Sequence, residues 1–316
     1  MKVKDILTKG WVVAFLALIC CTLWGSAFPC IKIGYSLFHI SSSDTGTQIL
    51  FAGLRFTLAG VMAIFIGSIT QKKVLLPTKK SIGRILGLCM FQTVIQYFFF
   101  YVGLAHTSGV KGSIIMGTNT LIAILAASLI YRQEELTSQK MIGCLIGFAG
   151  VVLANFSGSG IDFDFALNGE GFMLISAISY ALSSIYLKKY SKYDNPVMLS
   201  GYQFCVGGLI LMAIGGMMGG RLQEASVPAV GMLLYLAFVS AAAYSIWGIL
   251  LQYNPVSKVT IYGFTNPIIG VLLSAFMLHE GEQAFSLKNI VALVLVAAGI
   301  YVVNLRYHNS SNSFEK

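Results

Sequence analysis

Charge is what this sequence has least of. Only 10% of its 316 residues are Asp, Glu, Lys or Arg, whereas 56% are hydrophobic. A water-soluble domain carries about 25% charged residues, so this chain lacks the charge to cover a water-facing surface. The shortage excludes the pair of soluble domains that the length alone would suggest. It predicts an integral membrane protein.

Acidic residues are absent from the depth of the long apolar stretches. All twelve Asp and Glu lie in predicted loops, tails or helix ends. A carboxylate deep in the membrane is what a carrier of cations would use to neutralise its cargo, so we do not expect a permanently cationic solute. The apolar stretches also hold no paired acids, no nucleophile–base pair and no His-Glu-x-x-His motif, and the chain has no ATP-binding loop. We therefore expect neither an enzyme with catalytic residues nor an ATP-driven pump.

The cysteines form no framework. All six lie inside apolar stretches without a Cys-x-x-Cys pair, so we expect no disulfide staple, no metal site and no cofactor. The formal net charge is +9, but the basic residues occur in short clusters between apolar stretches. Clusters in that position set membrane topology, so we expect no nucleic-acid partner.

Long apolar stretches fill the rest of the chain. A membrane-spanning helix needs about 20 mostly apolar residues, and ten stretches approach or exceed that length. None alternates with a period of two, so a porin-like barrel is not expected. The sequence predicts an all-α integral membrane protein with ten transmembrane helices, over 11–31, 45–71, 85–110, 112–131, 141–161, 171–187, 195–220, 225–257, 259–279 and 289–305.

Basic residues are distributed unevenly between the two predicted sides of the membrane. With a cytoplasmic N-terminus, sixteen Lys and Arg fall on the inside and three on the outside, while Lys32 and Arg55 fall within helices. Cytoplasmic segments carry such an excess of positive charge. We therefore expect a multi-pass protein of the plasma membrane, the inner membrane of a bacterial cell, with both termini in the cytoplasm.

The second half of the sequence repeats the first at a shift of about 147 residues. The matches include Arg55-Phe56 with Gln203-Phe204, Gly60 with Gly208, Tyr97 with Tyr244, Phe100 with Trp247, 110–120 with 257–267, and 150–155 with 299–304. The predicted organisation is a cytoplasmic N-terminus at 1–10, a first five-helix repeat at 11–156, an external linker at 157–168, a second repeat at 169–305 and a cytoplasmic tail at 306–316.

Each predicted repeat contains five spans, which is an odd number. The second repeat therefore enters the membrane from the opposite side, giving two inverted five-helix repeats. This architecture is typical of carriers, in which a binding site lies near the midplane between the halves and rocking exposes it to each side in turn.

Several short motifs resemble those of one family. Leu23 to Phe28 (LWGSAF) followed by Lys32 is similar to the first-helix signature of the EamA type within the drug/metabolite transporter superfamily. Further similar patterns are Leu54-Arg55-Phe56, Glu134 to Thr137 with Gly143, Gly147 and Gly150, and Asn266-Pro267 through His279-Glu280. The resemblance covers essentially the whole chain. It implies a ten-helix exporter of small metabolites or drugs with a central cavity.

Two embedded positive charges are candidates for contact with a solute. Arg55 lies about ten residues into its span, roughly 15 Å deep, where a charge costs about 2.5–3.5 kcal/mol. Arg55 either locks helix packing through carbonyl groups or contacts the cargo. Lys258 either snorkels to the cytoplasmic surface or binds a carboxylate or phosphate. In a continuous helix, Tyr262 and Asn266 would share a face with Lys258.

Polar and aromatic side chains in otherwise apolar spans complete the predicted site. Ser residues in such spans are more often packing or hydrogen-bonding groups than ligands, whereas buried Trp and Tyr need a partner for their polar atoms. Together with the two cations, the predicted substrate-binding residues are Trp24, Arg55, Gln92, Gln96, Tyr97, Asn119, Tyr180, Ser183, Tyr244, Trp247, Lys258, Tyr262 and Asn266.

These observations favour a secondary transporter that exports small organic metabolites by alternating access. Amino acids or related neutral, zwitterionic or anionic solutes fit the cavity charge better than cations. A lipid scramblase or a membrane scaffold without transport activity is the alternative. The expected partners are a small-molecule substrate and the lipid bilayer, and we expect a monomer or a loose homodimer.

Overall fold

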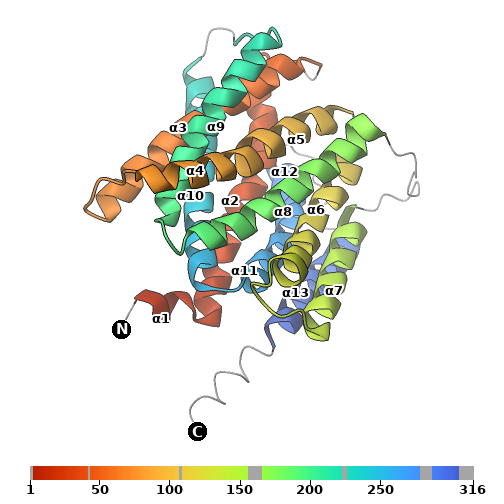
Figure 1. The fold of residues 1–316 in the computed structure, drawn as a ribbon. Coiled ribbons are helices and arrows are strands. Elements are labelled where there is room, and N and C mark those ends of the chain that lie inside the picture. Colours follow the sequence, from red (N-terminus) through yellow and green to blue (C-terminus); the bar gives the residue numbers. More distant parts are fainter. Residues whose placement is uncertain are drawn as a thin grey trace.

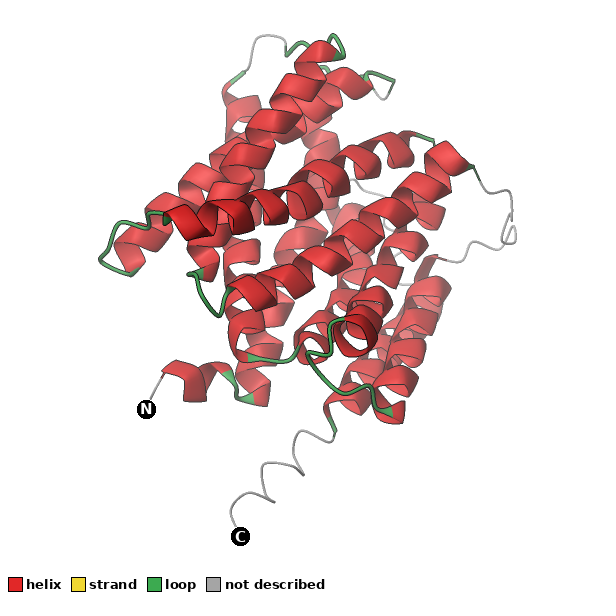
Figure 2. Ribbon diagram, viewed as in Figure 1, coloured by secondary structure: helices red, strands yellow, loops and turns green. Residues whose placement is uncertain are grey.

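The computed structural model describes residues 3–41, 43–106, 109–155, 166–222, 226–277 and 287–305. Regular structure within these ranges is helical, and no strand occurs in them (Figure 2). By length and composition, six helical stretches suffice to cross a membrane, and shorter apolar helices accompany them. The predicted all-α class is therefore confirmed for the described part of the chain. Most of the predicted linker 157–168, the tail 306–316 and the motif residues His279-Glu280 lie outside the described residues.

The helices follow one another in a simple order. They are α1 (Val3–Leu7), α2 (Gly10–Leu37), α3 (Thr45–Thr70), α4 (Lys79–Cys89), η1 (Met90–Ile95), α5 (Gln96–Ala105), α6 (Gly109–Leu125), η2 (Ala126–Ile130), α7 (Ser138–Asn155), η3 (Leu167–Gly171), α8 (Phe172–Tyr190), α9 (Pro196–Met217), α10 (Val227–Tyr253), α11 (Val256–Thr260), η4 (Ile261–Phe264), α12 (Thr265–Met277) and α13 (Leu287–Asn304). The segments η1, η2 and η3 are π-helical, and η4 is a 3₁₀ helix.

The helix predicted over 85–110 begins earlier than expected, at Lys79. The prediction stopped at Arg84 because it counted only charge-free residues. The Thr78 and Ser81 side chains form a capping box that starts the helix at Lys79, and the Lys79 and Lys80 side chains remain exposed. The charge-free run is therefore shorter than the helix, because it leaves out the charged residues at the start of the helix.

Glycine brings α3 and α9 into direct backbone contact. A Cβ atom added at Gly60 would lie 2.5 Å from the carbonyl oxygen of Gly201, and one added at Gly53 would lie 2.7 Å from that of Gly208. Small residues allow membrane helices this close approach. The pairing of Gly53 with Gly208 and of Gly60 with Gly201 shows that the two helices run antiparallel, side by side in Figure 1.

The helices α7 and α13 pack in the same way. A Cβ atom at Gly143 would lie 2.8 Å from the carbonyl oxygen of Gly299, and one at Gly150 would lie 2.8 Å from that of Ala292. Elsewhere α2 packs on α10 and α12, while α8 packs on α5 and α6. If each helix is replaced by its match in the other half, the packing of α2 on α10 and α12 becomes the packing of α8 on α5 and α6. The pairs α3–α9 and α7–α13 are each unchanged by this exchange. The contacts therefore have an approximate twofold relation.

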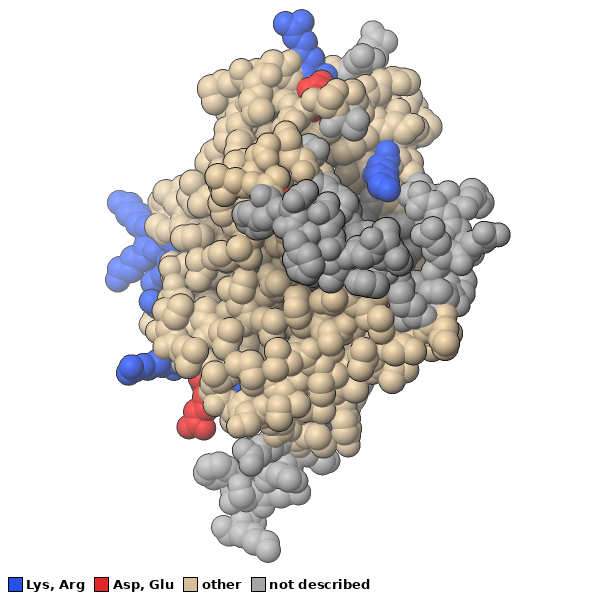
Figure 3. All heavy atoms as spheres, turned by 90° about the vertical axis from the view of Figure 1, so that its right-hand side faces the viewer, with Lys and Arg blue, Asp and Glu red and all other residues tan. Residues whose placement is uncertain are grey.

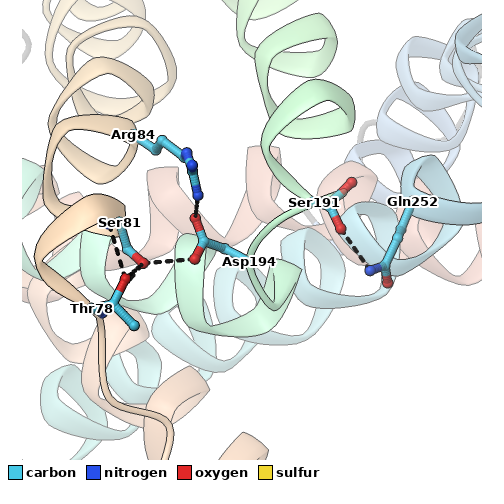
Figure 4. Close-up of polar contacts among 6 residues, drawn as sticks. All are labelled: Thr78, Ser81, Arg84, Ser191, Asp194 and Gln252. Carbon is cyan, nitrogen blue, oxygen red and sulfur yellow. Dashed lines mark hydrogen bonds and ion pairs between the residues drawn. The ribbon is translucent and has the colours of Figure 1, made fainter.

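On the face shown in Figure 3, the charged side chains lie around the edge, with a broad uncharged surface between them. At one end of the helical bundle, Arg84 Nη1 of α4 lies 2.6 Å from Asp194 Oδ2, and the Ser81 hydroxyl donates to Asp194 Oδ1 at 2.6 Å (Figure 4). Nearby, Gln252 of α10 donates to the Ser191 carbonyl at 2.7 Å. We call this end of the molecule, where α1 also packs against α10, the α1 end (Figure 1).

Candidate functional site

A cavity of about 120 Å³ lies in the middle of the bundle, where both halves meet. Its walls come from α2, α3, α5, α6, α8 and α10, and from the end of α11, η4 and the start of α12. Nine of the thirteen predicted binding residues line it: Trp24, Arg55, Gln96, Tyr97, Asn119, Tyr180, Tyr244, Trp247 and Asn266. Their role in binding a solute stays a prediction, but the structure places these residues in one cavity.

Aromatic rings form one wall of the cavity. The Trp24 ring meets those of Tyr244 and Trp247 edge-on, with ring centres 5.0 Å apart in both pairs, and it meets Tyr180 at 6.3 Å. Edge-to-face pairs at such distances contribute about 0.5–1.5 kcal/mol each beyond their buried area. Three helices, α2, α8 and α10, are held together through this one indole.

Residues matched by the sequence repeat touch each other where the halves meet. The hydroxyl groups of Tyr97 and Tyr244, at matched positions, lie 2.8 Å apart. The matched rings of Phe56 and Phe204 stack with centres 5.2 Å apart and planes 22° apart. In a twofold arrangement, only a residue near the axis can touch its own counterpart. These two pairs therefore place the approximate axis beside the cavity.

Arg55 is held at the cavity wall by α10. Its side chain is buried, and it donates from Nε to the Leu236 carbonyl at 3.2 Å and from Nη2 to the Ser240 hydroxyl at 3.0 Å. Its guanidinium carbon lies 5.1 Å from the centre of the Phe56 ring. Arg55 thus binds a carbonyl in the way expected of a residue that locks helix packing, and it also lines the cavity, while its contact with the cargo stays a prediction.

The position matched to Arg55 is neutral. Gln203 is fully buried on α9 and accepts a hydrogen bond from the Thr93 hydroxyl at 2.6 Å. At the repeat's shift of 147 residues, Thr93 is matched to Ser240. The contact between Arg55 and Ser240 therefore has a counterpart between Gln203 and Thr93, with a charge on one side only. The cavity carries its buried positive charge on one side of the approximate axis.

Four predicted residues are not brought to the cavity. Gln92 accepts a hydrogen bond from Gln203 Nε2 at 3.1 Å, between α9 and η1. The Ser183 hydroxyl donates to the Tyr180 carbonyl at 2.7 Å within its own helix. The Ser183 interaction is the common use of serine in a membrane helix, and both side chains bond away from the cavity, although Nε2 of Gln92 has no hydrogen-bond partner among the described residues.

Lys258 and Tyr262 are the other two predicted residues that do not line the cavity. Their predicted common face with Asn266 requires a continuous α-helix, but η4 interrupts the segment with a 3₁₀ turn over Ile261–Phe264. The 3₁₀ turn has 3.0 residues per turn instead of 3.6, so the stripe is broken. Asn266 lines the cavity, whereas Lys258 Nζ donates to the Thr8 carbonyl at 2.8 Å at the α1 end.

Sequence reasoning missed several residues that line the cavity. They are Ala27, Ile31, Phe100, Tyr101, Met116, Ala123, Thr260 and Gly263. A signal was present for Phe100, which the repeat matches to the predicted Trp247. Tyr101 follows Tyr97 by one helical turn and shares its face. The small and aliphatic residues carry no such signal, because their types are common throughout membrane helices.

Several buried polar atoms around the cavity have no hydrogen-bond partner among the described residues. They are Nε1 of Trp24, Nε1 of Trp247, Oε1 of Gln96, Oδ1 of Asn266 and the hydroxyl of Tyr101. A buried group left unpaired costs about 1–3 kcal/mol, so these atoms call for partners such as water or a bound solute. The described ranges contain no group of three His, Cys, Asp or Glu that could hold a metal ion.

The chain matches a known family over nearly its whole length. The family model of the EamA-like transporters matches residues 11–156 and 167–305. A protein named "Probable amino-acid metabolite efflux pump" from Salmonella typhimurium is 25% identical, over 91% of this chain and 93% of that protein. An "Uncharacterized transporter YvbV" from Bacillus subtilis is also 25% identical, over 93% and 91%.

Two further comparisons extend this result. A "WAT1-related protein" of Arabidopsis thaliana, chloroplastic, is 29% identical over 64% of this chain, and the matched part spans half of that protein. One crystal structure, 17% identical, superposes over 93% of this chain and 96% of its own with a TM-score of 0.74, which shows a shared fold. The match to the family model covers far more than half of the sequence, so the chain is a multi-pass membrane protein that belongs to the EamA-like transporter family.

Proposed function

We propose that this transporter exports small organic metabolites, amino acids or related neutral, zwitterionic or anionic solutes, through the central cavity. The observation that carries the proposal is the buried guanidinium of Arg55 at the wall of an aromatic cavity. Arg offers five N–H donors in a fixed geometry that suits carboxylates. The described lining residues include no Asp or Glu that would neutralise a cation.

The size of the cavity favours a small solute. One water molecule needs about 10–15 Å³ by this measure of volume, so about 120 Å³ holds roughly ten waters. A solute with about as many non-hydrogen atoms, such as an amino acid, would fill it. The unpaired amide oxygens of Gln96 and Asn266 could accept hydrogen bonds from the ammonium or hydroxyl groups of such a solute.

Alternating access between two inverted five-helix repeats is the mechanism that we propose, with ten spans in all. The twofold relation of the helix contacts supports it, as does the match of the family model in two stretches. We further propose that the protein lies in the inner membrane of a bacterial cell as a monomer or loose dimer, with both termini in the cytoplasm. The name of the Salmonella relative, a probable efflux pump, agrees with export.

A thermal-shift screen tests the solute class directly. The purified protein is heated with amino acids, nucleobases, sugar phosphates and quaternary amines, because a bound ligand raises the unfolding temperature. We expect carboxylate-bearing solutes to stabilise the wild type and to lose that effect in Arg55→Gln. Stabilisation by quaternary amines alone would overturn the proposed charge preference.

Solute efflux from loaded proteoliposomes then tests transport. Efflux of the stabilising solute, inhibited by an excess of the same solute, is expected. Translocation of a fluorescent phospholipid without solute efflux would instead favour a scramblase, and neither activity would favour a scaffold.

A further inference from the structure

The α10–α11 connection at the α1 end is held by residues of the other half of the chain. The Glu134 carboxylate, in the connection between η2 and α7, accepts from the Ser257 N–H at 3.0 Å and from the Ser257 hydroxyl at 2.7 Å. Lys140 Nζ lies 3.3 Å from the same carboxylate. The side chains of Glu134 and Lys140 are 6% and 11% exposed, so this is a largely buried ion pair.

Glu134 caps the start of α11, which has no capping side chain of its own. The N-cap of α11 is Pro255, which makes no side-chain capping hydrogen bond. The first N–H groups of a helix need acceptors, and Glu134 supplies one to Ser257 in the first turn. The start of α11 is therefore fixed by a carboxylate from the first half of the chain.

Other contacts converge on the same connection. Lys188 Nζ donates to the carbonyls of Leu251 and Asn254, and Asn254 Nδ2 donates to the Leu7 carbonyl at 2.9 Å. Lys258 Nζ donates to the Thr8 carbonyl at 2.8 Å. In these bonds a side chain donates to a backbone carbonyl, whereas Glu134 is a side chain that accepts from both the backbone and the hydroxyl of Ser257.

The connection lies between the cavity and the α1 end. Thr260, the last residue of α11, lines the cavity, and its carbonyl accepts a hydrogen bond from Thr120 of α6 at 3.2 Å. Val256 and Val259, also on α11, are fully buried. A movement of α11 away from the first half would open this part of the cavity wall and would separate Ser257 from Glu134.

A charged contact is well suited to a gate that must open repeatedly. The Glu134–Lys140 ion pair lies within the first half and stays together when α11 moves, so the contacts that break are the two hydrogen bonds from Ser257 to the carboxylate. When water enters, it can hydrate both the carboxylate and the Ser257 groups, so these bonds fix the closed geometry without a large barrier to release. Apolar contacts of equal size would leave apolar surface exposed to water.

We propose that Glu134 is a latch that keeps the cavity closed toward the α1 end, and that its release from Ser257 accompanies opening. The inference rests on the proposed alternating access and on no particular solute. It assigns a gating role to a carboxylate outside the cavity.

A native cysteine reports on this gate. Cys21 Sγ contacts the Tyr262 carbonyl at 3.3 Å, just beyond α11, and its side chain is buried in the closed arrangement. The rate at which a small maleimide labels Cys21, in a background with Cys20, Cys30, Cys89, Cys144 and Cys205 replaced by Ala, measures how often this segment moves away.

Glu134→Gln tests the latch, with Glu135→Gln as the matched control. Hydrogen bonds to a charged group are stronger than those to a neutral one, so the loss of this charge should raise the labelling rate at least about tenfold. The control removes the same charge from the adjacent, exposed side chain and should change the rate less than twofold. Ser257→Ala keeps the backbone bond and should give an intermediate rate. Equal rates in Glu134→Gln and Glu135→Gln would overturn the proposal.

Hydrogen–deuterium exchange gives a second measurement that does not depend on the cysteine background. Amide exchange in residues 260–264 should accelerate in Glu134→Gln and not in Glu135→Gln, while exchange in α3 and α9 stays unchanged. Acceleration throughout the chain would mean general destabilisation and would count against a latch. Because neither readout uses a solute, failure of the latch is distinguishable from failure of the proposed substrate class, which the Arg55→Gln screen measures.

Discussion

Position 55 in the first half and position 203 in the second correspond through the repeat, yet one is Arg and the other Gln. Both are buried, and each bonds to a hydroxyl from the other half, Ser240 for Arg55 and Thr93 for Gln203. The same packing position therefore carries a charge that faces the cavity in one half and a neutral amide network in the other. Symmetric packing is retained where the halves join, and the chemistry differs where a solute would bind.

The largest expected effect follows from neutralising the charged half. Arg55→Gln makes position 55 like position 203 and should weaken binding of a carboxylate-bearing solute about 10- to 150-fold, since a hydrogen bond to a charged group contributes about 1.5–3 kcal/mol. Isothermal titration or thermal shift with the solute found in the screen measures this loss.

Gln203→Leu is the matched change in the neutral half. It leaves the buried Gln92 and Thr93 groups without their partner, so it should lower the unfolding temperature while solute affinity stays within about twofold. If Gln203→Leu weakened binding as much as Arg55→Gln, the assignment of the charged side as the binding side would be wrong.

The packing that the halves share should be sensitive to a single methyl group. Gly208→Ala on α9 places a Cβ atom 2.5 Å from the Thr57 backbone nitrogen, and such overpacking costs about 1–3 kcal/mol. Thermal unfolding in detergent should show the loss. Gly216→Ala, on the same helix with no atom within 4 Å of the new Cβ, is the control. An equal loss in both variants would argue against the close α3–α9 contact.

A smaller effect is expected from the hydroxyl that positions Arg55. Ser240→Ala removes the acceptor for Nη2 while the Leu236 carbonyl still holds Nε, so solute affinity should fall about 3- to 10-fold, as for one hydrogen bond of about 1 kcal/mol. Ser240→Thr keeps the hydroxyl, as Thr93 does in the second half, and should restore affinity. If both variants lost affinity equally, the methyl group and not the hydroxyl would matter.

The smallest effect is expected at the N-terminal caps of α3 and α9, two helices that correspond through the repeat. Asp44 caps α3 and Asn195 caps α9, each accepting backbone N–H bonds. Hydrogen bonds from the Thr47 side chain and backbone lower the pKa of Asp44 below its usual value. Because the folded pKa is below the unfolded one, the stabilisation is present above about pH 4 and is lost as the pH falls through the folded pKa.

Thermal unfolding between pH 3 and pH 6 should therefore show a small decrease at the acidic end that Asp44→Asn removes. The change should stay under about 1 kcal/mol because the carboxylate is mostly exposed. An unchanged pH profile in Asp44→Asn would show that this cap does not contribute.

Much of the fold was readable from hydropathy, because only helices satisfy their backbone groups within lipid. The ends of the helices were harder to predict from the sequence. Charged residues stopped the predicted span at Arg84, whereas the Thr78–Ser81 capping box extends the helix to Lys79. In the same way, a stripe through Lys258 and Asn266 assumed a continuous helix, and the 3₁₀ turn at Ile261–Phe264 separates the two side chains.

The amino-acid sequence alone determined the apolar helices, the repeat between the halves and most of the aromatic and amide residues of the cavity, because hydropathy and residue spacing are local properties. Tertiary structure decided which polar side chains meet. It placed Arg55 on Ser240, Gln92 on Gln203 and Glu134 on Ser257, since partners more than a hundred residues apart are chosen by how the helices pack and not by any pattern along the chain.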